Sequence, residues 1–576
     1  MSPSMRYDHP AYFRNEWIQP TDRVVRTEVC IYGASASGVI AAVTLVRRGH
    51  RVTLLQPGGF VGGMTTGGLG WTDSGKKAAV GGMARQFYRD LGGRYGKPEE
   101  WQFEPHAADA VLQGYLDEAG IEPIFYQYLD TVDMRGQKIT AATMIGGLRV
   151  EADLFIDATY EGDLLAKAGV NFTVGRESNA TYGETLNGVQ VRCETDDPFG
   201  DHHQFDSPVD PYRIEGDPSS GLLPGILDED LTTRQGEGDR RIQAYNFRVC
   251  MTDDPSLKID WVQPEGYDPA DYVLLDRWLA SGKSAFNEQL MHDPAYHTPI
   301  RKFDVLPMRT ANGYRKTDTN NHGAVSSDFI GGNQSWPEGD YLTRERIFQD
   351  HVRWQQGLYW HIANSPTVPV RYREAYRKWG LARDEFGETG HWPHQLYVRE
   401  ARRMVSDHVV TEHDCLGRRR ASKSIGLASY TMDSHHTARF VRVVDGRPQV
   451  LNEGNVEVGP SAPFAIDYRC VVPARGQCVN LFVPVCLSVS HIAYGSVRME
   501  PVFMLLGESV GVAASLCLGR RCSAQDLPYP FLRSELEAAG QVLEDPAVQE
   551  SAAPLVSSSP LASGTLSYEK SLQGQS

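Results

Sequence analysis

The chain lacks the residue spacings that mark metal sites and disulfide frameworks. Its nine cysteines are dispersed between Cys30 and Cys522, with no C-x-x-C pair and no His/Cys set at metal-ligand spacing. An odd, dispersed set of thiols is typical of a reducing compartment. The first ten residues are polar and contain no apolar signal-peptide core. The sequence therefore predicts a cytoplasmic protein that holds no metal.

Signatures of several other functional classes are also missing. No run approaches the roughly 18 apolar residues of a membrane span, and a net charge of −16 disfavours nucleic acids and anionic membranes as partners. No H-E-x-x-H, G-x-S-x-G or P-loop motif occurs. The length of 576 residues, 41% of them hydrophobic, suits two or more globular domains. We therefore expect a small-molecule substrate.

What the chain does contain is a strand, a glycine turn, a helix and a second strand within residues 29–56. This order is typical of a dinucleotide-binding βαβ unit, in which turn N–H groups and the helix dipole attract phosphates. Ser35 replaces the usual second glycine and Gln56 the usual acidic residue, so an ordinary α/β glycine turn is the alternative. No second glycine fingerprint indicates an NAD(P)H domain. The expected cofactor contacts in this unit are Gly33, Ser35, Ala36, Gly38 and Gln56.

A run of small residues follows the second strand. It reads Gly62-Gly63-Met64-Thr65-Thr-Gly-Gly-Leu-Gly and provides bare backbone against which a flat cofactor can lie. A flexible loop is the alternative. We expect the cofactor to contact Gly62, Gly63, Met64 and Thr65.

This run resembles the signature of a family of FAD-dependent oxidoreductases, found mostly in bacteria, with a glutathione-reductase-like FAD-binding fold. Segments that match the same family are 81–88, 103–108, 157–164, 399–403 and 491–501, the last reading His-Ile-Ala-Tyr-Gly-Ser-Val-Arg-Met-Glu-Pro. The matches keep their order from about residue 28 to 520 and so cover most of the chain. The resemblance implies FAD as the cofactor and leaves the substrate open. Further expected cofactor contacts are Asp157, Asp163, Met499 and Glu508.

These observations predict an α/β fold in which a Rossmann-like FAD-binding domain is split by an inserted α+β substrate or cap domain. The insertion is expected where periodicity is poor and Asp, Pro, His, Trp and Tyr are frequent. The expected parts are an N-terminal arm (1–27), the first FAD-binding part (28–170), the insertion (171–395), the second FAD-binding part (396–525) and a C-terminal extension with a disordered tail (526–576).

The late motif is where we expect the flavin ring and the chemistry. A predicted strand at 480–485 leads through the motif into a helix, which places the helix start and Arg498 at the pyrimidine edge of the ring. His491 is the predicted proton acceptor and Tyr494 the residue that orients that proton. A structural salt bridge for Arg498 and a packing role for His491 are the alternatives.

Arg402 is the third predicted catalytic residue, because a guanidinium holds a carboxylate or a developing oxyanion. Arg399 lies one helical turn before it, and a helix there would bring both side chains to one face. A solvated or phosphate-facing cationic stripe is the alternative. Asp73 in the early loop is a candidate base, with a loop-capping role as its alternative.

The sequence therefore predicts an FAD-dependent dehydrogenase or oxidase that passes hydride from a small polar oxygenated organic substrate to flavin N5. The substrate is expected between the cofactor domain and the insertion, near aromatic side chains such as Trp336 and Trp392, for which packing of the cap is the alternative. Two rival functions remain open, a non-redox flavin-containing isomerase or hydratase and a non-catalytic flavin-binding sensor. The sequence does not predict the electron acceptor (oxygen or another carrier), a covalent flavin bond or the oligomeric state.

Overall fold

One mixed sheet organises one half of the molecule. The computed structural model describes residues 9–191, 203–205, 207–281, 303–321 and 323–545. The sheet has the order β2-β1-β5-β4-β3, and β22 also pairs with β5. Its strands are β1 (Val24–Tyr32), β2 (Val52–Leu55), β3 (Leu129–Arg135), β4 (Lys138–Met144), β5 (Arg149–Asp157) and β22 (Leu481–Phe482).

The strands at the centre of this sheet are parallel. β1 pairs in parallel with β2 on one side and with β5 on the other. The far edge of β5 is shared, because β4 pairs antiparallel near Val150 and β22 pairs in parallel near Phe155. The carboxyl ends of β1, β2 and β5 therefore meet at one edge, which is where ligands bind in open parallel sheets. The predicted α/β fold with a Rossmann-like sheet is confirmed.

Two local predictions after residue 395 are wrong. The strand expected at 480–485 is cut short, because the N–H of Val483 donates to the carbonyl of Val471 at 2.9 Å and the backbone leaves the sheet. The stretch that carries Arg399 and Arg402 is not helical. The two guanidiniums therefore do not lie on one helix face. Each binds a different carboxylate.

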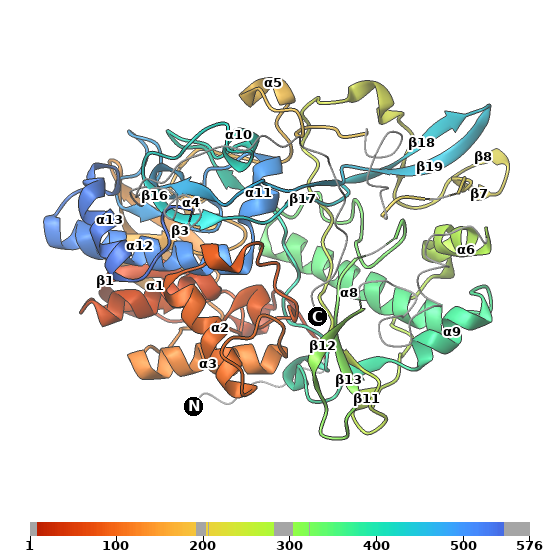
Figure 1. Cartoon of the computed structure of the whole chain (residues 1–576), viewed down its shortest axis with the longest axis horizontal. Coiled ribbons are helices and arrows are strands. Elements are labelled where there is room, and N and C mark those ends of the chain that lie inside the picture. Colours follow the sequence, from red (N-terminus) through yellow and green to blue (C-terminus); the bar gives the residue numbers. More distant parts are fainter. Residues whose placement is uncertain (1–8, 192–202, 206, 282–302, 322, 546–576) are drawn as a thin grey trace, which may run out of the picture.

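Helices α1 (Ala36–Arg47) and α12 (Glu500–Arg520) pack against each other and bring together distant parts of the chain (Figure 1). An ideal Cβ on Gly507 would lie 2.2 Å from the carbonyl oxygen of Ser37. An ideal Cβ on Gly511 would lie 3.0 Å from the side chain of Thr44. The two helices therefore approach closely where these glycines carry no side chain. Around this pair pack α2 (Gly82–Arg94), α3 (Pro105–Ala119) and α13 (Tyr529–Ala538).

Within the described residues, α12 is the one helix long and apolar enough to cross a membrane by length and composition alone. Its most apolar window has a mean hydropathy of 1.8, and 78% of that window is buried inside the protein. A helix that is apolar on all sides is expected in the core of a large globular fold.

The middle of the chain builds an antiparallel sheet and a 24-residue helix, α8. Figure 1 shows these green elements on the opposite half of the molecule from α1 and α12. The sheet order is β11-β14-β10-β13-β12. The elements are β10 (Met251–Thr252), β11 (Lys258–Ile259), β12 (Phe303–Arg309), β13 (Arg315–Thr319), β14 (Gly380–Ala382), α6 (Val273–Ala280), α8 (Tyr341–Asn364) and α9 (Val370–Arg377).

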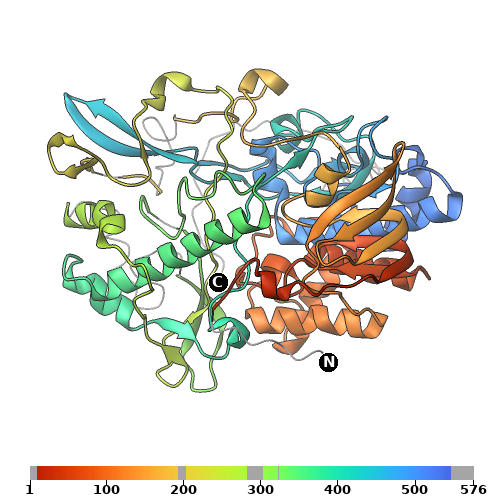
Figure 2. The ribbon, with the colours of Figure 1, turned by 180° about the vertical axis from the view of Figure 1, so that it is seen from behind.

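Short ladders and helices complete the described fold. β18 pairs antiparallel with β19 and in parallel with β9, so this hairpin follows residue 395 in sequence yet lies with the middle segment (Figures 1 and 2). The remaining elements are β6 (Phe172–Thr173), β7 (Tyr212–Ile214), β8 (Asp217–Leu222), β9 (Ile226–Leu227), β15 (Arg403–Met404), β16 (Ser424–Ala428), β17 (Met432–Ser434), β18 (Ala438–Val444), β19 (Arg447–Glu453), β20 (Val456–Val458), β21 (Phe464–Asp467), α4 (Asp163–Lys167), α5 (Asn179–Tyr182), α10 (Glu412–Cys415) and α11 (His491–Val497).

Both ends of the described chain contain ordered structure. β1 begins at Val24, inside the range assigned to the N-terminal arm. Earlier in the arm, the ring of Phe13 packs on Tyr128 and Tyr341, with centroid distances of 4.8 and 5.7 Å. The C-terminal extension contains α13, while the tail predicted to be disordered lies outside the described residues from 546 onward.

Candidate functional site

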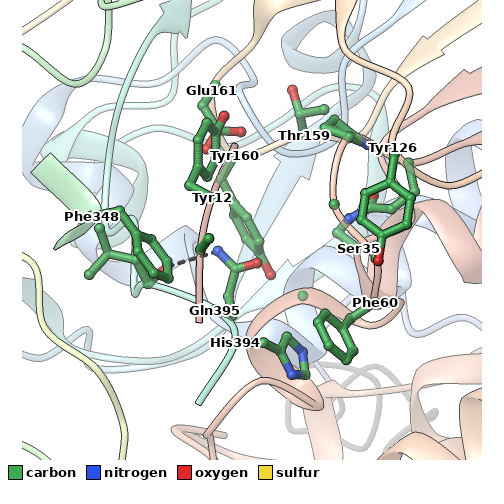
Figure 3. Close-up of a pocket in the computed structure, with 18 of the residues that line it drawn as sticks. Tyr12, Ser35, Phe60, Tyr126, Thr159, Tyr160, Glu161, Phe348, His394 and Gln395 are labelled. Atoms are coloured by element: carbon green, nitrogen blue, oxygen red, sulfur yellow. Dashed lines mark hydrogen bonds between the residues drawn. The ribbon is translucent and has the colours of Figure 1, made fainter. Parts of the chain in front are cut away.

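A pocket opens at the carboxyl edge of the parallel sheet, between the glycine turn, the N-terminal arm and the middle segment (Figure 3). It holds about 880 Å³ of empty space, counting its open mouth. Lining residues that the sequence predicted as cofactor contacts are Gly33, Ser35, Gln56 and Gly63. We call this space the cofactor pocket.

Two hydrogen bonds of the Ser35 side chain fix the conformation of the glycine turn after β1. The Ser35 hydroxyl donates to the carbonyl of Ala158 at 2.7 Å and accepts the N–H of Gly38 at 3.3 Å, which caps α1. Gly33 has a φ of 101°, and an ideal Cβ there would lie 2.7 Å from the backbone nitrogen of Thr159. A side chain would therefore both strain the turn and close this wall of the pocket. Ala36 is the first, fully buried residue of α1.

Gln56 fixes the same turn from the end of β2. Its side-chain Oε1 accepts the N–H of Ala34 at 2.7 Å. The carbonyl of Ala34 in turn accepts the N–H of Gly62 at 2.7 Å. The first and second glycine runs are therefore tied together by backbone contacts at the pocket wall.

Tyr160 anchors the second glycine run. Its hydroxyl accepts the N–H of Met64 at 3.0 Å, and an ideal Cβ on Gly63 would lie 2.3 Å from the same oxygen. Tyr160 and Thr65 donate to the two carboxyl oxygens of Glu500, at 2.7 and 2.6 Å. The run therefore docks on the start of α12.

Glu500 is a buried acid at the first residue of α12. Burial raises its pKa to about 7, although the hydrogen bonds from Thr65 and Tyr160 act in the opposite direction. Met499, an expected cofactor contact, is the buried N-cap residue and does not line the cofactor pocket. The helix start predicted beside the flavin thus carries a carboxyl group that is largely protonated below neutral pH.

Aromatic side chains that the sequence did not predict form flat walls of the cofactor pocket (Figure 3). Phe60 stacks on His394 with ring centroids 4.0 Å apart and an interplanar angle of 11°. Burial lowers the pKa of His394 to about 3, and its Nε2 has no hydrogen-bond partner among the described residues. The further aromatic lining residues are Tyr12, Trp17, Tyr126, Tyr160 and Phe348. They come from the arm, from irregular segments and, in the case of Phe348, from α8.

Beyond the pocket lies a polar group that we call the inner cluster. Tyr397 follows the lining residue Leu396, and it lies close enough to Tyr160 to raise the pKa of that phenol. Arg498 donates to the Tyr397 hydroxyl at 2.7 Å, and the Arg399 guanidinium lies 4.8 Å from the centroid of the Tyr397 ring. The inner cluster consists of Asp73, Arg248, Tyr397, Arg399, Tyr430 and Arg498.

All three arginines of the inner cluster have a buried donor without a partner among the described residues, and in Arg248 it is Nη1. Arg399 pairs with Asp328 through Nη1 at 2.9 Å, but its Nε and Nη2 have no partner among the described residues. The Nε of Arg498 is likewise buried without a partner there. Burial lowers the pKa of Arg399, and the neighbouring Arg498 lowers it further. Buried donors without acceptors are costly, so these N–H groups suit an anionic or oxygen-rich ligand.

Asp73 places a carboxylate in the same cluster. It is partly exposed and accepts the hydroxyl of Tyr430 at 3.0 Å. It also lies close enough to Tyr397, Arg248 and Arg498 to raise their pKa values. An accessible carboxylate beside unsatisfied guanidiniums is a suitable proton acceptor for a bound hydroxyl group.

The structure places His491 and Tyr494 in α11, away from the cofactor pocket. His491 is 2% exposed, its Nδ1 lies 2.8 Å from a carboxylate oxygen of Glu400, and its Nε2 lies 3.1 Å from the hydroxyl of Ser434. Tyr494 donates to the carbonyl of Val485 at 3.0 Å. Both ring nitrogens and the phenol are thus engaged by protein groups.

Arg402 and Asp163 are engaged with each other instead of facing the pocket. Arg402 Nη1 donates to Asp163 at 2.7 Å and to the carbonyl of Glu161 at 3.0 Å. Arg344 binds both oxygens of Asp163, at 2.6 and 2.9 Å. Burial alone would raise the pKa of Asp163, but Arg344 and Arg402 lower it to about 2. Arg344 lies far away in sequence, so this network was not predictable from the motif.

Asp157 and Glu508 also have structural partners outside the cofactor pocket. Asp157 accepts the N–H and the hydroxyl of Thr159 and the N–H of Leu165, and so shapes the turn that lines the pocket. Glu508 accepts the N–H of Met83 at 2.9 Å and the amide of Gln541 at 2.6 Å. Asp157 therefore supports the site indirectly, whereas Glu508 holds α2 against α12.

The aromatic residues proposed for substrate contact are mostly core residues. Trp336 is fully buried and packs on Tyr12 and Tyr245. Trp392 is 1% exposed and packs on Phe247. The packing alternative therefore describes both tryptophans.

Two glutamates and a histidine elsewhere have the spacing of a metal site, but a lysine ammonium of the protein already lies among them. Glu104, His106 and Glu385 lie close enough together to hold a metal ion. The ammonium of Lys316 donates to Glu104 and Glu385 at 2.7 Å each. It already supplies the positive charge that these carboxylates need.

The residues of the cofactor pocket fit the FAD expected from the sequence. Gly33 and Gly63 keep its wall bare where a Cβ would collide with neighbouring atoms. Phe60 and His394 offer a flat stacked surface with an unsatisfied nitrogen. Phosphates suit the turn at the start of α1, and flat rings suit the aromatic walls.

A comparison with protein families agrees with this fit. The family profile described as FAD dependent oxidoreductase matches residues 28–536. Among solved structures, L-proline dehydrogenase from P. horikoshii is 16% identical over 27% of this chain and 59% of that chain, with a TM-score of 0.22. A flavocytochrome c3 fumarate reductase is 15% identical over 28% of this chain and 44% of that chain, with a TM-score of 0.20. The chain thus spans less than two thirds of these structures.

The comparison with curated proteins finds no match. The family assignment therefore depends on the profile, which covers most of the chain from β1 to α13. The protein belongs to the FAD-dependent oxidoreductase family and binds FAD.

Proposed function

We propose that this enzyme oxidises a small polar oxygenated organic substrate at the inner cluster. The observation that carries the proposal is the set of buried donors on Arg399 and Arg498 that have no acceptor among the described residues. The partly exposed carboxylate of Asp73 lies in the same cluster and interacts with Arg498. A substrate with a hydroxyl or carboxylate group would satisfy these donors. Bound FAD would supply the hydride acceptor, at N5 of its flavin ring.

In this proposal, Asp73 accepts the proton of the substrate hydroxyl. Arg399 and Arg498 hold the substrate oxygen while negative charge develops on it. The adjacent carbon gives up its hydrogen with both electrons to the cofactor. The products are a carbonyl compound, a protonated Asp73 and the reduced cofactor, so atoms and electrons balance.

His491 has a positioning role in this proposal. Its two ring nitrogens already contact Glu400 and Ser434, and its exposure is only 2%. Arg402 likewise holds Asp163 and does not bind substrate. These assignments replace the direct catalytic roles that the sequence predicted for His491 and Arg402.

The test is anaerobic reduction of the FAD-loaded protein by a panel of polyols, hydroxy acids and amines, followed by flavin bleaching. Asp73→Asn should lower the bleaching rate by about 10²–10⁴, the usual contribution of a positioned general base, with FAD content unchanged. His491→Gln should change the rate by less than about tenfold. Readmitting air afterwards separates an oxidase, whose flavin colour returns rapidly, from a dehydrogenase.

The opposite pattern would contradict the assignment. A normal rate in Asp73→Asn with a rate about 10²-fold lower in His491→Gln would return the base to His491. No bleaching by any panel member would favour a non-redox isomerase or hydratase, or a flavin-binding sensor.

A further inference from the structure

A second cavity lies in the middle segment and shares no lining residue with the cofactor pocket. It holds about 990 Å³ of empty space, counting its mouth, between β9, β18 and α8. Phe329 and Trp354 stack in its wall with ring centroids 4.9 Å apart. The other apolar lining residues include Ile226, Leu274, Val325 and Ile330. We call it the β18 cavity.

Arg439 on β18 places a buried positive charge at this cavity. Arg439 is 4% exposed. Burial lowers the pKa of its guanidinium to about 10, so the guanidinium is charged at neutral pH. Its Nε donates to the amide oxygen of Asn452 and its Nη2 to the carbonyl of Ala324, both at 2.9 Å. Both partners are neutral.

No carboxylate pairs with Arg439 among the described residues. Asp328 is the one charged group with a resolved effect on its pKa, and Asp328 already pairs with Arg399 at 2.9 Å and His435 at 2.8 Å. Arg241, the other cation at the cavity, differs in this respect. It pairs with Asp239 at 2.8 Å and with Glu229.

An uncompensated buried charge is unfavourable, because the charge has lost its hydration without gaining a counter-ion. Arg439 Nη1 has no acceptor among the described residues, and the indole N–H of Trp354 is also unpartnered there. The cavity therefore combines apolar and aromatic walls with unsatisfied N–H donors. An anion with an apolar body matches each of these features.

We propose that the β18 cavity binds an organic carboxylate with an apolar, ring-sized body, whose carboxylate pairs with Arg439. The pairing would supply the counter-charge that the described residues do not, while the body displaces water from Phe329 and Trp354. This site is separate from the FAD pocket and does not depend on the oxidation proposed at the inner cluster.

The test is calorimetric titration of the FAD-loaded protein with 2-naphthoate and with naphthalene-2-carboxamide, a neutral compound of the same shape. The wild-type protein should bind the carboxylate at least about tenfold more tightly than the amide. Arg439→Met should weaken 2-naphthoate binding by about tenfold or more and leave amide binding within about twofold. Arg241→Met, at the same cavity but at a cation already paired, should leave 2-naphthoate binding within about twofold.

A second variant keeps the test independent of how well Arg439→Met folds. Ile226→Trp enlarges a side chain that lines the cavity, keeps Arg439, and should weaken the binding of both compounds. Equal binding of the carboxylate and the amide by the wild-type protein would overturn the proposal. So would 2-naphthoate binding that survives both Arg439→Met and Ile226→Trp.

Discussion

At the scale of single residues, Glu500 shows how burial turns an ordinary acid into a pH-sensitive part of the fold. In the folded protein Glu500 keeps its proton up to about pH 7, because burial raises its pKa, while an unfolded carboxyl loses the proton near its ordinary pKa of 4.5. Between these values the folded state binds more protons than the unfolded state. The free energy of unfolding therefore falls as the pH rises from about 4.5 to about 7.

Glu500→Gln should remove this part of the pH dependence, because the amide resembles the protonated acid. The difference between 4.5 and about 7 corresponds to about 3 kcal/mol of stability at most. Urea denaturation at about pH 5 and about pH 8 should show the variant gaining relative to the wild type at the higher pH. Glu118→Gln, which changes an exposed side chain, is the control. A variant whose stability runs parallel to the wild type across this range would remove Glu500 from the explanation.

At the scale of elements, the contact between α1 and α12 depends on glycine at one position. Gly507→Ala adds a methyl group that would meet the Ser37 carbonyl at 2.2 Å. Overpacking of this kind costs about 1–3 kcal/mol, while replacing a helical glycine by alanine gains up to about 1 kcal/mol. We expect a net loss of about 1–2 kcal/mol in the free energy of unfolding, measured by urea denaturation.

Gly519→Ala is the matched control in the same helix. An ideal Cβ there meets nothing within 4 Å, so the helix-propensity gain is unopposed and the variant should be as stable as the wild type or slightly more stable. Equal stability changes in Gly507→Ala and Gly519→Ala would show that α1 shifts to accommodate the added methyl group.

At the scale of the whole molecule, the N-terminal arm connects α8 to the cofactor pocket. Glu345 on α8 accepts the backbone N–H groups of Tyr12 and Phe13, at 2.7 and 2.9 Å. Tyr12 lines the pocket, and Phe13 packs on Tyr128 next to β3 and on Tyr341 of α8. A change at Glu345 therefore acts on FAD through the arm and not through a direct contact.

Glu345→Ala should raise the Kd for FAD by about tenfold, because two hydrogen bonds that hold the arm are lost. Titration of the apoprotein with FAD, followed by flavin fluorescence, measures the change. Asp350→Ala, on the same helix at an exposed position, should leave the Kd within about twofold. An unchanged Kd in Glu345→Ala would mean that the arm closes the pocket without this anchor.

The sequence by itself determined the parallel sheet, the cofactor and the glycine-lined part of the pocket wall. Gly33 and Gly63 line the pocket, as the two glycine runs predicted. These features depend on backbone conformation and on spacing along one segment, which neighbouring residues specify. The family resemblance extended the same information to the choice of FAD.

Only the tertiary structure decided which charged side chains are available for chemistry. Arg402 and Arg399 are close in sequence and equal in charge, yet Arg402 pairs with Asp163 and Arg399 with Asp328. Among the described residues this leaves one buried donor of Arg402 and two of Arg399 without partners. Asp163 also binds Arg344 of α8, and His491 contacts Glu400 and Ser434. A side chain becomes free or engaged according to partners that distant segments bring to it. No motif within one segment records those partners, because the partners are fixed only when the segments pack.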